Sequence, residues 1–531
     1  MYVLLAQRPQ AFYDLLERNT IYTIESLDTM HYQPFFPINQ LENVGPLWKY
    51  RVHKKIVILI QKLLVEISHM LGLELRAVVP GHFLKHDLLV WNVVPLIEVL
   101  KKLGIVKSFL EVAPSYPDEP QGHIIRVVIH GRGGLGYKGS GRDIFDKSKA
   151  AWAGVGEAIE RWALSNYYPL QNELIDSSFK NLRQKKLNIF SIVGFSDILR
   201  KKGHPEYNLL FDEMAIFRWV KAYSLIDNEV IYVPLQLVSF RRCYEISGIY
   251  GKRDEKTESL LAPIISSGAA TGQTLERALL NGLLEVIERD AFMIHWFNTI
   301  VLDRINIHTI PDERVHALSV IAERYNLEVH LVYLKTDVPV HTVLCLVIDK
   351  TGIGPAVYLD AKSGFQLSEV VYAILSESLA IRQGVRRFMD TNSPSFQFKN
   401  YASLGHKERM LFWFQKERIK NVLFWTTGNI KEYSDFPNYA VSVKNTAEEL
   451  TTLLAFFKKQ RYQVLYKEIL EESIKKKLSG ITTVMVKVPQ FQPLYLDESL
   501  PAFADSRIKE VPRKIGIMPR ASLNTFPHPF V

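Results

Sequence analysis

The chain has 531 residues, 47% of them hydrophobic and 23% charged, which is the composition of a globular protein rather than of a disordered or fibrous one. The net charge is +9, but the basic residues lie in short scattered clusters, which argues against nucleic acid as a partner. The two cysteines, Cys243 and Cys345, exclude a disulfide framework and an all-cysteine zinc site, and no run reaches the roughly 18 apolar residues of a membrane span.

Residues 1–115 predict a mainly helical region. The chain starts with MYVLLAQRPQ, whose apolar patch is too short for a signal peptide, so we expect a cytoplasmic protein without a membrane partner. Segments 53–73 and 93–110 have apolar residues at helical spacing, the second with Gly104 as a break, and three prolines within 112–122 mark a boundary. This region contains no motif that we can assign. We interpret it as a docking or dimerisation region and expect a homodimer.

Residues 116–531 mix strands and helices, which predicts an α/β (α+β) core with both sheet faces at least partly covered. Strands are predicted at 123–131, 217–225, 229–240, 327–334, 342–349 and 355–361. Helices are predicted at 145–168, with Asp143 or Asp146 as N-cap, within 265–297 after a loop, and at 367–389.

A glycine-rich segment, GRGGLGYKGSGRD, spans residues 131–143 between the first of these strands and the first helix. Its GRGGLG part fits the dinucleotide-binding pattern, but it does not open a helix directly and no clean βαβ unit follows. The chain also lacks a P-loop sequence. We therefore interpret 131–143 as a flexible loop rather than as a Rossmann site.

Two helical segments repeat one pattern 128 positions apart (285 − 157): GVGEAIER at 154–161 and GLLEVIER at 282–289. Positions i, i+3 and i+4 of a helix share a face, so each segment presents two glutamates and an arginine together. A single such segment would most simply be a surface ion pair. Two facing copies would instead gather carboxylates that repel one another unless cations such as Mg²⁺ separate them, with arginines suited to phosphate.

Three stretches resemble the YcaO family, specifically its azoline-forming cyclodehydratases: 139–163, 266–292 and the ending LNTFPHPFV. The resemblance covers about residues 115–531 and implies a YcaO-type ATP-binding core without a P-loop. It implies ATP and Mg²⁺ as cofactors, and it assigns the metal to the motif glutamates Glu157, Glu160, Glu285 and Glu288. It also assigns nucleotide contacts to these glutamates and to Arg161, Arg289, Gln273, Glu377 and Arg382.

The family's proline-rich tail reaches the active site, so His528 and the Val531 carboxylate are candidate catalytic groups, together with Arg289. The sequence departs from the family pattern at three places. Ala153 stands where many members have serine, Arg277 where many have an acidic residue, and Val531 where the last proline of the tail is usual.

The resemblance implies ATP-dependent cyclodehydration of Cys, Ser or Thr in a ribosomally made precursor peptide, giving thiazoline or oxazoline through phosphorylation of the backbone amide oxygen. Such chemistry matures thiazole- and oxazole-modified microcins and other bacteriocins. We expect a separate leader-binding partner related to ubiquitin-activating enzymes, and a flavin dehydrogenase wherever azolines are oxidised. Two alternatives stay open: a YcaO-type thioamide-forming enzyme, and a non-catalytic scaffold that binds peptide for a modification complex.

Overall fold

The computed structural model describes residues 84–130, 138–247, 258–392, 400–401, 404–443 and 445–530. Three sequence predictions fall outside these ranges: the helix at 53–73, the GRGGLG segment at 131–136 and the Val531 carboxylate. The described residues mix helices with three sheets in one compact unit that starts at His86, so the predicted α/β class is confirmed.

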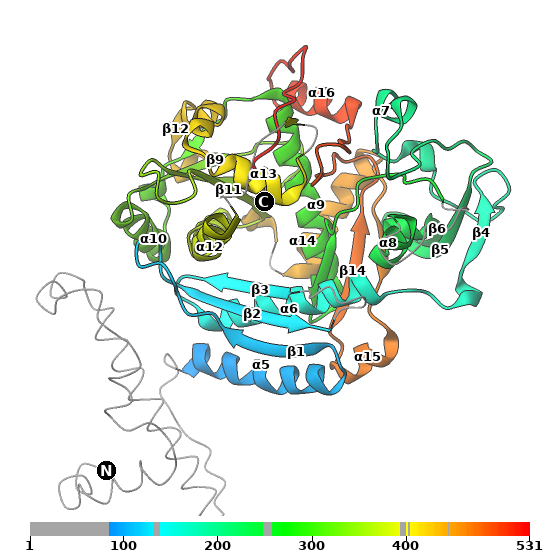
Figure 1. Ribbon diagram of the computed structural model, residues 1–531, viewed down its shortest axis with the longest axis horizontal. Coiled ribbons are helices and arrows are strands. Elements are labelled where there is room, and N and C mark those ends of the chain that lie inside the picture. Colours follow the sequence, from blue (N-terminus) through cyan, green and yellow to red (C-terminus); the bar gives the residue numbers. More distant parts are fainter. Residues whose placement is uncertain are drawn as a thin grey trace, which may run out of the picture. The chain divides into compact units, whose positions relative to one another are not determined.

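The first sheet is antiparallel and follows helix α5 (Figure 1). These elements are α5 (Leu84–Lys102), β1 (Val106–Glu111), β2 (His123–Ile129) and β3 (Lys138–Asp143). The break predicted at Gly104 is confirmed: α5 ends at Lys102, and Gly104 takes a left-handed backbone conformation, with φ +67°. The residues after the break form strand β1 and not the expected helix. Strand β1 then pairs with β2, so the sheet crosses the predicted domain boundary at residue 116.

Helix α6 (Lys147–Asn166) packs on strand β3 at two glycines. A Cβ on Gly141 would lie 1.8 Å from the carbonyl oxygen of Ala150, and one on Gly139 would lie 2.3 Å from that of Gly154. The predicted flexible loop is therefore wrong for the six residues of β3. Their glycines allow a strand and a helix to approach closely, and they do not mark a loop.

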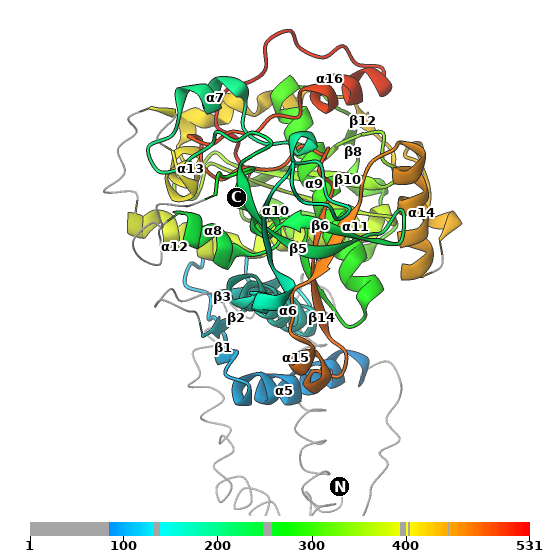
Figure 2. The ribbon, with the colours of Figure 1, turned by 90° about the vertical axis from the view of Figure 1, so that its right-hand side faces the viewer.

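The second sheet is antiparallel and has the order β4-β5-β13-β14-β7, with β6 pairing β5. Its strands are β4 (Ile175–Ser178), β5 (Ile216–Ser224), β6 (Glu229–Pro234), β7 (Ala269–Gly272), β13 (Leu465–Glu468) and β14 (Thr482–Lys487). Helix α9 (Leu275–Asn298) is capped by the side chain of Thr274 and packs on β7 and β14. Helix α6 also contacts β7, and Figure 2 shows it between the first sheet and β14.

The third sheet has the order β11-β10-β9-β8-β12. Its strands are β8 (Arg304–Ile305), β9 (Leu327–Tyr333), β10 (His341–Asp349), β11 (Val357–Gly364) and β12 (Ile430–Lys431). Along β10, alternate side chains join two separate cores, one with α9 and one with α10 (Glu313–Arg324) and α11 (Leu367–Ala380). Every residue of β10 is buried, so both faces of this sheet are covered, as predicted.

The helical segment predicted at 367–389 is two helices, because α12 (Arg382–Asn392) follows α11 after one residue. The remaining helices of eight or more residues are α8 (Phe240–Ser247), α13 (His406–Trp413), α14 (Thr446–Lys459) and α16 (Asp505–Lys514), and the shorter ones are α7 (Asp197–Lys202) and α15 (Glu472–Lys477). Asp146, one of the two predicted N-caps, caps α6 by accepting from the Lys149 N–H. A search of the described ranges for a helix long and apolar enough to cross a membrane finds none.

Candidate active site

The two motif helices are positioned by the same hydrogen bond. In each, the first glutamate accepts a backbone N–H from 17 residues earlier: Ser140 donates to Glu157, and Gly268 donates to Glu285. Each donor lies in or directly before the strand that leads into the helix. The repeat seen in the sequence is therefore also a repeat of strand–turn–helix geometry.

The motif side chains of α6 and α9 face one another. Burial raises the pKa of Glu160 well above its usual range, and the nearby carboxylates of Glu285 and Glu157 raise it further. The guanidiniums of Arg161 and Arg289 act in the opposite direction on the same carboxyl. The predicted gathering of carboxylates and arginines is thus what the structure contains.

Arg289 interacts with three carboxylates on the α9 side of the site. Its guanidinium donates to Glu288 at 2.7 Å and to Glu285 at 3.3 Å, and it lies 3.8 Å from Asp360 on β11. Burial raises the pKa of Glu288 to about 8, and burial together with the charge of Glu377 raises the pKa of Asp360 to about 6. The environment of this side of the site therefore disfavours the simultaneous ionisation of Glu288 and Asp360 near neutral pH.

Glu377 lies on α11 and adds a further acidic side chain to the row formed by the acids of α6, α9 and β11. Its carboxylate forms ion pairs with Arg142 of β3 at 3.9 Å and with Lys362 of β11 at 3.8 Å. The predicted nucleotide contact at Glu377 therefore lies beside Asp360 and between two cations from different sheets.

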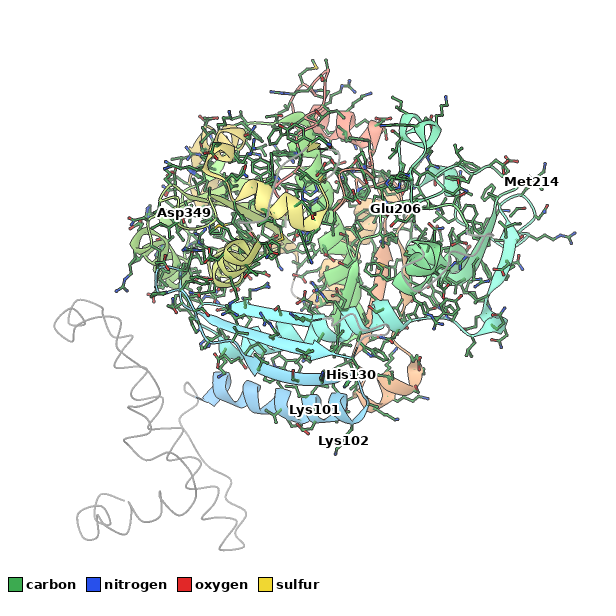
Figure 3. The ribbon with its side chains drawn as sticks, in the orientation of Figure 1. Lys101, Lys102, His130, Glu206, Met214 and Asp349 are labelled. Carbon is green, nitrogen blue, oxygen red and sulfur yellow. The ribbon has the colours of Figure 1, made fainter. Side chains whose placement is uncertain are left out.

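Arg382 and Gln273 lie differently from the motif residues. Arg382 is fully buried and donates to Glu119 at 2.5 Å and to Asp349 at 2.9 Å, the latter labelled in Figure 3. This buried ion pair joins α12 to β10 and to the segment after β1, and it gives Arg382 a structural role. Gln273 is exposed just before α9 begins. Nucleotide contacts by these two residues remain predictions.

Asp290 follows the second motif directly but belongs to a different interaction. It is completely buried, and its Oδ1 accepts from the Arg507 Nε at 2.7 Å and from the Gln492 N–H at 2.9 Å. Arg507 also pairs with Asp337 at 3.0 Å and stacks over the ring of Phe491. This Asp290–Arg507 pair fastens the side of α9 that the motif glutamates do not use.

The described part of the C-terminal tail reaches the motif arginine Arg289. Its chain is held by hydrogen bonds from the Trp296 and Trp413 indoles to carbonyl oxygens of the tail, and its Phe530 forms a β-bridge with Leu359 at the edge of the third sheet. The buried Phe530 ring lies 4.2 Å from the guanidinium of Arg289. The expectation that the tail reaches the site is therefore met up to Phe530.

His528 anchors this tail. Its ring is fully buried between Phe292 and Tyr495, and its Nε2 donates to the Tyr495 carbonyl at 2.7 Å. Burial lowers the pKa of His528 well below its usual range, so the ring is neutral. Its Nδ1 has no hydrogen-bond partner among the described residues. Its catalytic role remains a prediction, and its contacts favour holding the tail in place.

The residues fit magnesium that arrives with a nucleotide. In the part of the chain that the structure describes, no three acidic, histidine or cysteine side chains converge to hold an ion by themselves. Mg²⁺ usually takes one or two carboxylates and completes its shell with phosphate and water. Burial disfavours the ionised forms of Glu160 and Glu288, which bound cations would favour, and the buried Nε of Arg289 lacks a partner among the described residues.

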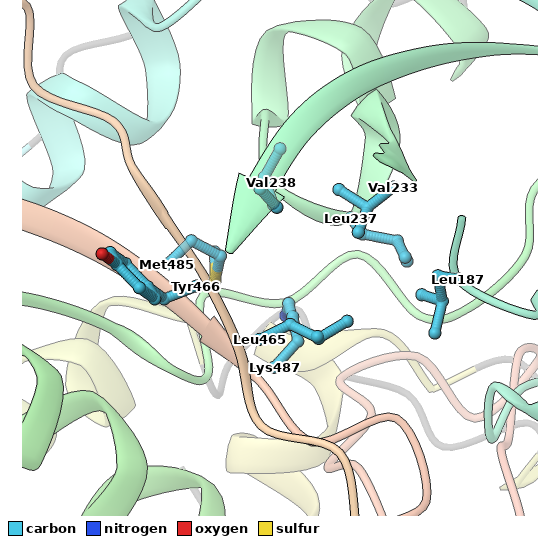
Figure 4. Close-up of a pocket in the computed structure, with 9 residues that line it drawn as sticks. Leu187, Val233, Leu237, Val238, Leu465, Tyr466, Met485 and Lys487 are labelled. Atoms are coloured by element: carbon cyan, nitrogen blue, oxygen red, sulfur yellow. The ribbon is translucent and has the colours of Figure 1, made fainter. Parts of the chain in front are cut away.

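A narrow apolar pocket is lined mainly by strands of the second sheet (Figure 4). Its lining residues are Leu187, Ala222, Val233, Leu237, Val238, Leu465, Tyr466, Met485 and Lys487. Lys487 donates to the carbonyl of Ser267 at 3.1 Å, next to the Gly268 N–H that binds Glu285. Burial lowers the pKa of Lys487 to about 8. Lys487 thus supports the loop under a motif glutamate.

The sequence did not predict four residues that line the site: Asp360, Lys362, Arg142 and Phe530. Asp360 and Lys362 alternate with apolar residues on β11, as any half-exposed strand would, so no local pattern distinguishes them. Arg142 was hidden in the glycine-rich segment. Phe530 offered one signal, an aromatic ring in a tail expected to reach the site.

Solved structures with a similar fold include two heterocyclases. One, in complex with substrate and cofactor, has a TM-score of 0.64 and 18% identity, covering 82% of this chain and 57% of that one. The other, the heterocyclase TruD, has a TM-score of 0.53 and 17% identity, covering 72% of this chain and 51% of that one. This chain therefore spans little more than half the length of either.

A third similar structure is YcaO from Methanopyrus kandleri bound with AMPPCP and Mg²⁺, at a TM-score of 0.53 and 18% identity, covering 79% of this chain and 94% of that one. No curated protein matches the sequence. The model of the ATP- and Mg²⁺-binding YcaO cyclodehydratase family matches residues 143–492, about two thirds of the chain and both motif helices. The chain therefore belongs to the YcaO cyclodehydratase family, with ATP and Mg²⁺ as its cofactors, as the resemblance predicted.

Proposed function

We propose that the protein catalyses ATP-dependent cyclodehydration of Cys, Ser and Thr residues in a ribosomally made precursor peptide, giving thiazoline and oxazoline rings. The observation that carries this proposal is a row of acidic side chains with raised pKa values beside an arginine that the tail covers. Mutual repulsion in such a row suits Mg²⁺ ions and the phosphates that they bring.

In the proposed reaction, the thiol or hydroxyl of the peptide side chain loses its proton and adds to the preceding amide carbonyl carbon. The resulting oxyanion attacks the γ-phosphorus of ATP and releases ADP. Phosphate then leaves from carbon while the nitrogen loses its proton, which forms the C=N bond of the azoline. Each ring costs the peptide one water, and phosphorylation turns a poor leaving group into a good one.

The motif glutamates Glu157, Glu160, Glu285 and Glu288 would hold Mg²⁺, which supplies positive charge opposite the transferring phosphoryl group. Arg161 and Arg289 would bind phosphate oxygens, because both guanidiniums already lie among these carboxylates. Glu377, flanked by its two cations, would contact the nucleotide at the other end of the row.

The nucleophile needs a base. We assign this role to the Val531 carboxylate, because the preceding residue, Phe530, contacts Arg289. His528 would hold the tail in position, since its Nε2–H is committed to a carbonyl and its ring is buried. A neutral histidine with a strongly lowered pKa is a weak base, which favours this division of roles.

We further propose that a separate leader-binding protein presents the peptide, in the cytoplasm. A similar heterocyclase has been captured with substrate and cofactor, which supports peptide access to a fold of this kind. We expect the isolated chain to hydrolyse ATP slowly and to cyclise peptide poorly, and a partner to raise peptide turnover strongly. Efficient leader-dependent cyclisation by the chain alone would show that residues 1–115 contain the recognition element.

The decisive test uses a Cys/Ser/Thr-rich precursor whose amide carbonyls carry heavy oxygen, incubated with the full chain, its partner and Mg-ATP. Loss of one water per ring, with the heavy oxygen recovered in inorganic phosphate and one ADP released, is the expected result. Cyclisation without label in the phosphate would refute amide phosphorylation. Thioamide formed when sulfide is supplied would indicate the alternative chemistry, and absence of ATP turnover would indicate a scaffold.

A further inference from the structure

An aromatic ring covers one face of the Arg289 guanidinium, and three carboxylates lie close to its terminal nitrogens. These nitrogens point toward Glu288, Glu285 and Asp360, at 2.7, 3.3 and 3.8 Å. The ring of Phe530 lies over the guanidinium at 4.2 Å from its centroid. The Arg289 guanidinium could turn toward any of these three carboxylates. Its orientation therefore depends on the contacts that fix the plane of the guanidinium.

Phe530 is held in place by contacts other than Arg289. Its ring lies 4.7 Å from that of Phe292 in an edge-on arrangement, and its side chain is 1% exposed. Its carbonyl oxygen accepts from Arg409 at 3.2 Å, and its backbone pairs with Leu359, the residue before Asp360. The ring is therefore a fixed surface on which the guanidinium of Arg289 rests.

We propose that Phe530 is a positioning residue that holds the plane of Arg289 for phosphate binding. The proposal rests on the Mg-nucleotide site of the proposed function and extends it to the tail. Mg²⁺ held by the carboxylates would offset their charge, and Arg289 would then be free to bind phosphate. The aromatic face then restricts the guanidinium to movement within its own plane and supplies attraction to a cation. Without the ring, the guanidinium of Arg289 can adopt more orientations. It then binds the nucleotide more weakly, because more conformational freedom is lost on binding.

The test compares three single variants of the full chain. Phe530→Leu removes the aromatic face but keeps an apolar side chain, and Phe530→Tyr restores the face. Phe526→Leu is the matched control, because Phe526 is another aromatic residue of the tail whose ring contacts Tyr401, Phe412 and Trp413 rather than Arg289. Calorimetric binding of AMPPCP with Mg²⁺ reports the nucleotide site without any peptide.

We expect Phe530→Leu to weaken AMPPCP binding by about 2- to 30-fold, the range for a cation–π contact, and Phe530→Tyr and Phe526→Leu to bind within about twofold of wild type. In an Arg289→Lys background, Phe530→Leu should cost much less, because the planar partner is gone. The corresponding change in steady-state ATP hydrolysis should be in KM more than in kcat.

Three results would overturn the positioning role. They are wild-type affinity in Phe530→Leu, equal losses in Phe530→Leu and Phe526→Leu, and no rescue by a Phe530→Tyr variant whose melting temperature matches wild type. The test is independent of ring formation. If wild type binds AMPPCP but does not cyclise peptide, the proposed function fails while the role of Phe530 can still be decided.

Discussion

Replacing Glu288 by glutamine should have opposite effects on activity and on stability. Glu288 is 5% exposed, and burial raises its pKa to about 8 from an ordinary value of 4.5. Glutamine resembles the protonated acid in shape but cannot neutralise Mg²⁺. We therefore expect Glu288→Gln to abolish ATP turnover while the magnesium-free protein folds at least as well as wild type.

The magnitude follows from the rise in pKa, which corresponds to about 5 kcal/mol against the ionised carboxylate. Because the folded pKa lies above the unfolded one, the stability linked to the bound proton is fully present below pH 4.5 and is lost as pH rises through about 8. Glutamine removes this loss, and the pKa of about 8 already includes the attraction of the Arg289 guanidinium. At pH 9 the variant should therefore be more stable than wild type by up to about 5 kcal/mol.

Two assays check this prediction: ATP hydrolysis at saturating Mg²⁺, and thermal melting in EDTA at pH 6 and pH 9. The matched control is Glu276→Gln, an exposed acid on the first turn of the same helix, which should change neither result appreciably. Full ATP hydrolysis by Glu288→Gln would remove this residue from the metal site. Melting temperatures that fall equally with pH in variant and wild type would show that Glu288 is ionised in the folded protein.

Gly141→Ala places a methyl group inside the backbone of α6 and should destabilise the fold by about 3 kcal/mol, whereas Gly156→Ala, with open space at its Cβ, should stabilise it by about 0.5–1 kcal/mol. Urea unfolding of both variants checks this, and equal changes would refute the close strand–helix approach. Arg507→Met should cost about 3–5 kcal/mol by leaving Asp290 buried and unpaired, and Asp290→Asn in the same chain should restore part of it, so an additive double variant would contradict the pairing. Deleting Pro527–Val531 should slow cyclisation by about 100-fold, measured by mass spectrometry of the peptide, and an unchanged rate would show that the tail has no part in the reaction.

The parts of the site that are local in sequence could be predicted. The two motif helices have strong helical periodicity and carry their functional side chains at fixed intervals, so helix geometry alone places Glu157 with Glu160 and Glu285 with Glu288. That α6 and α9 lie together was an expectation from carboxylate chemistry; both helices pack on β7, and the charge of Glu285 on α9 acts on Glu160 of α6. The alternation of strands and helices likewise sufficed for the fold class.

The parts that depend on long-range packing could not be predicted. Asp360 reaches Arg289 only because β11 lies at the sheet edge beside α9, and nothing near residue 360 records this. The glycines of β3 were misinterpreted for a related reason. Glycine serves loops and close approaches equally well, and only the neighbouring helix decides between them. Arg382 matched a family position, yet its donors go to Glu119 and Asp349.

The Asp290–Arg507 pair has a mechanical consequence for a protein that binds and releases a highly charged ligand in every cycle. If the glutamates of α9 hold Mg²⁺ as proposed, the binding of magnesium and phosphate attracts them from one side, and release leaves their charges to repel one another. A helix held only by apolar contacts could rotate about its axis when these electrostatic forces change. The buried Asp290 carboxylate, whose Oδ1 accepts from Arg507 and from the Gln492 N–H, opposes such a rotation. Loosening this pair should therefore blunt the response to nucleotide from a distance, in a variant whose phosphate ligands are all intact.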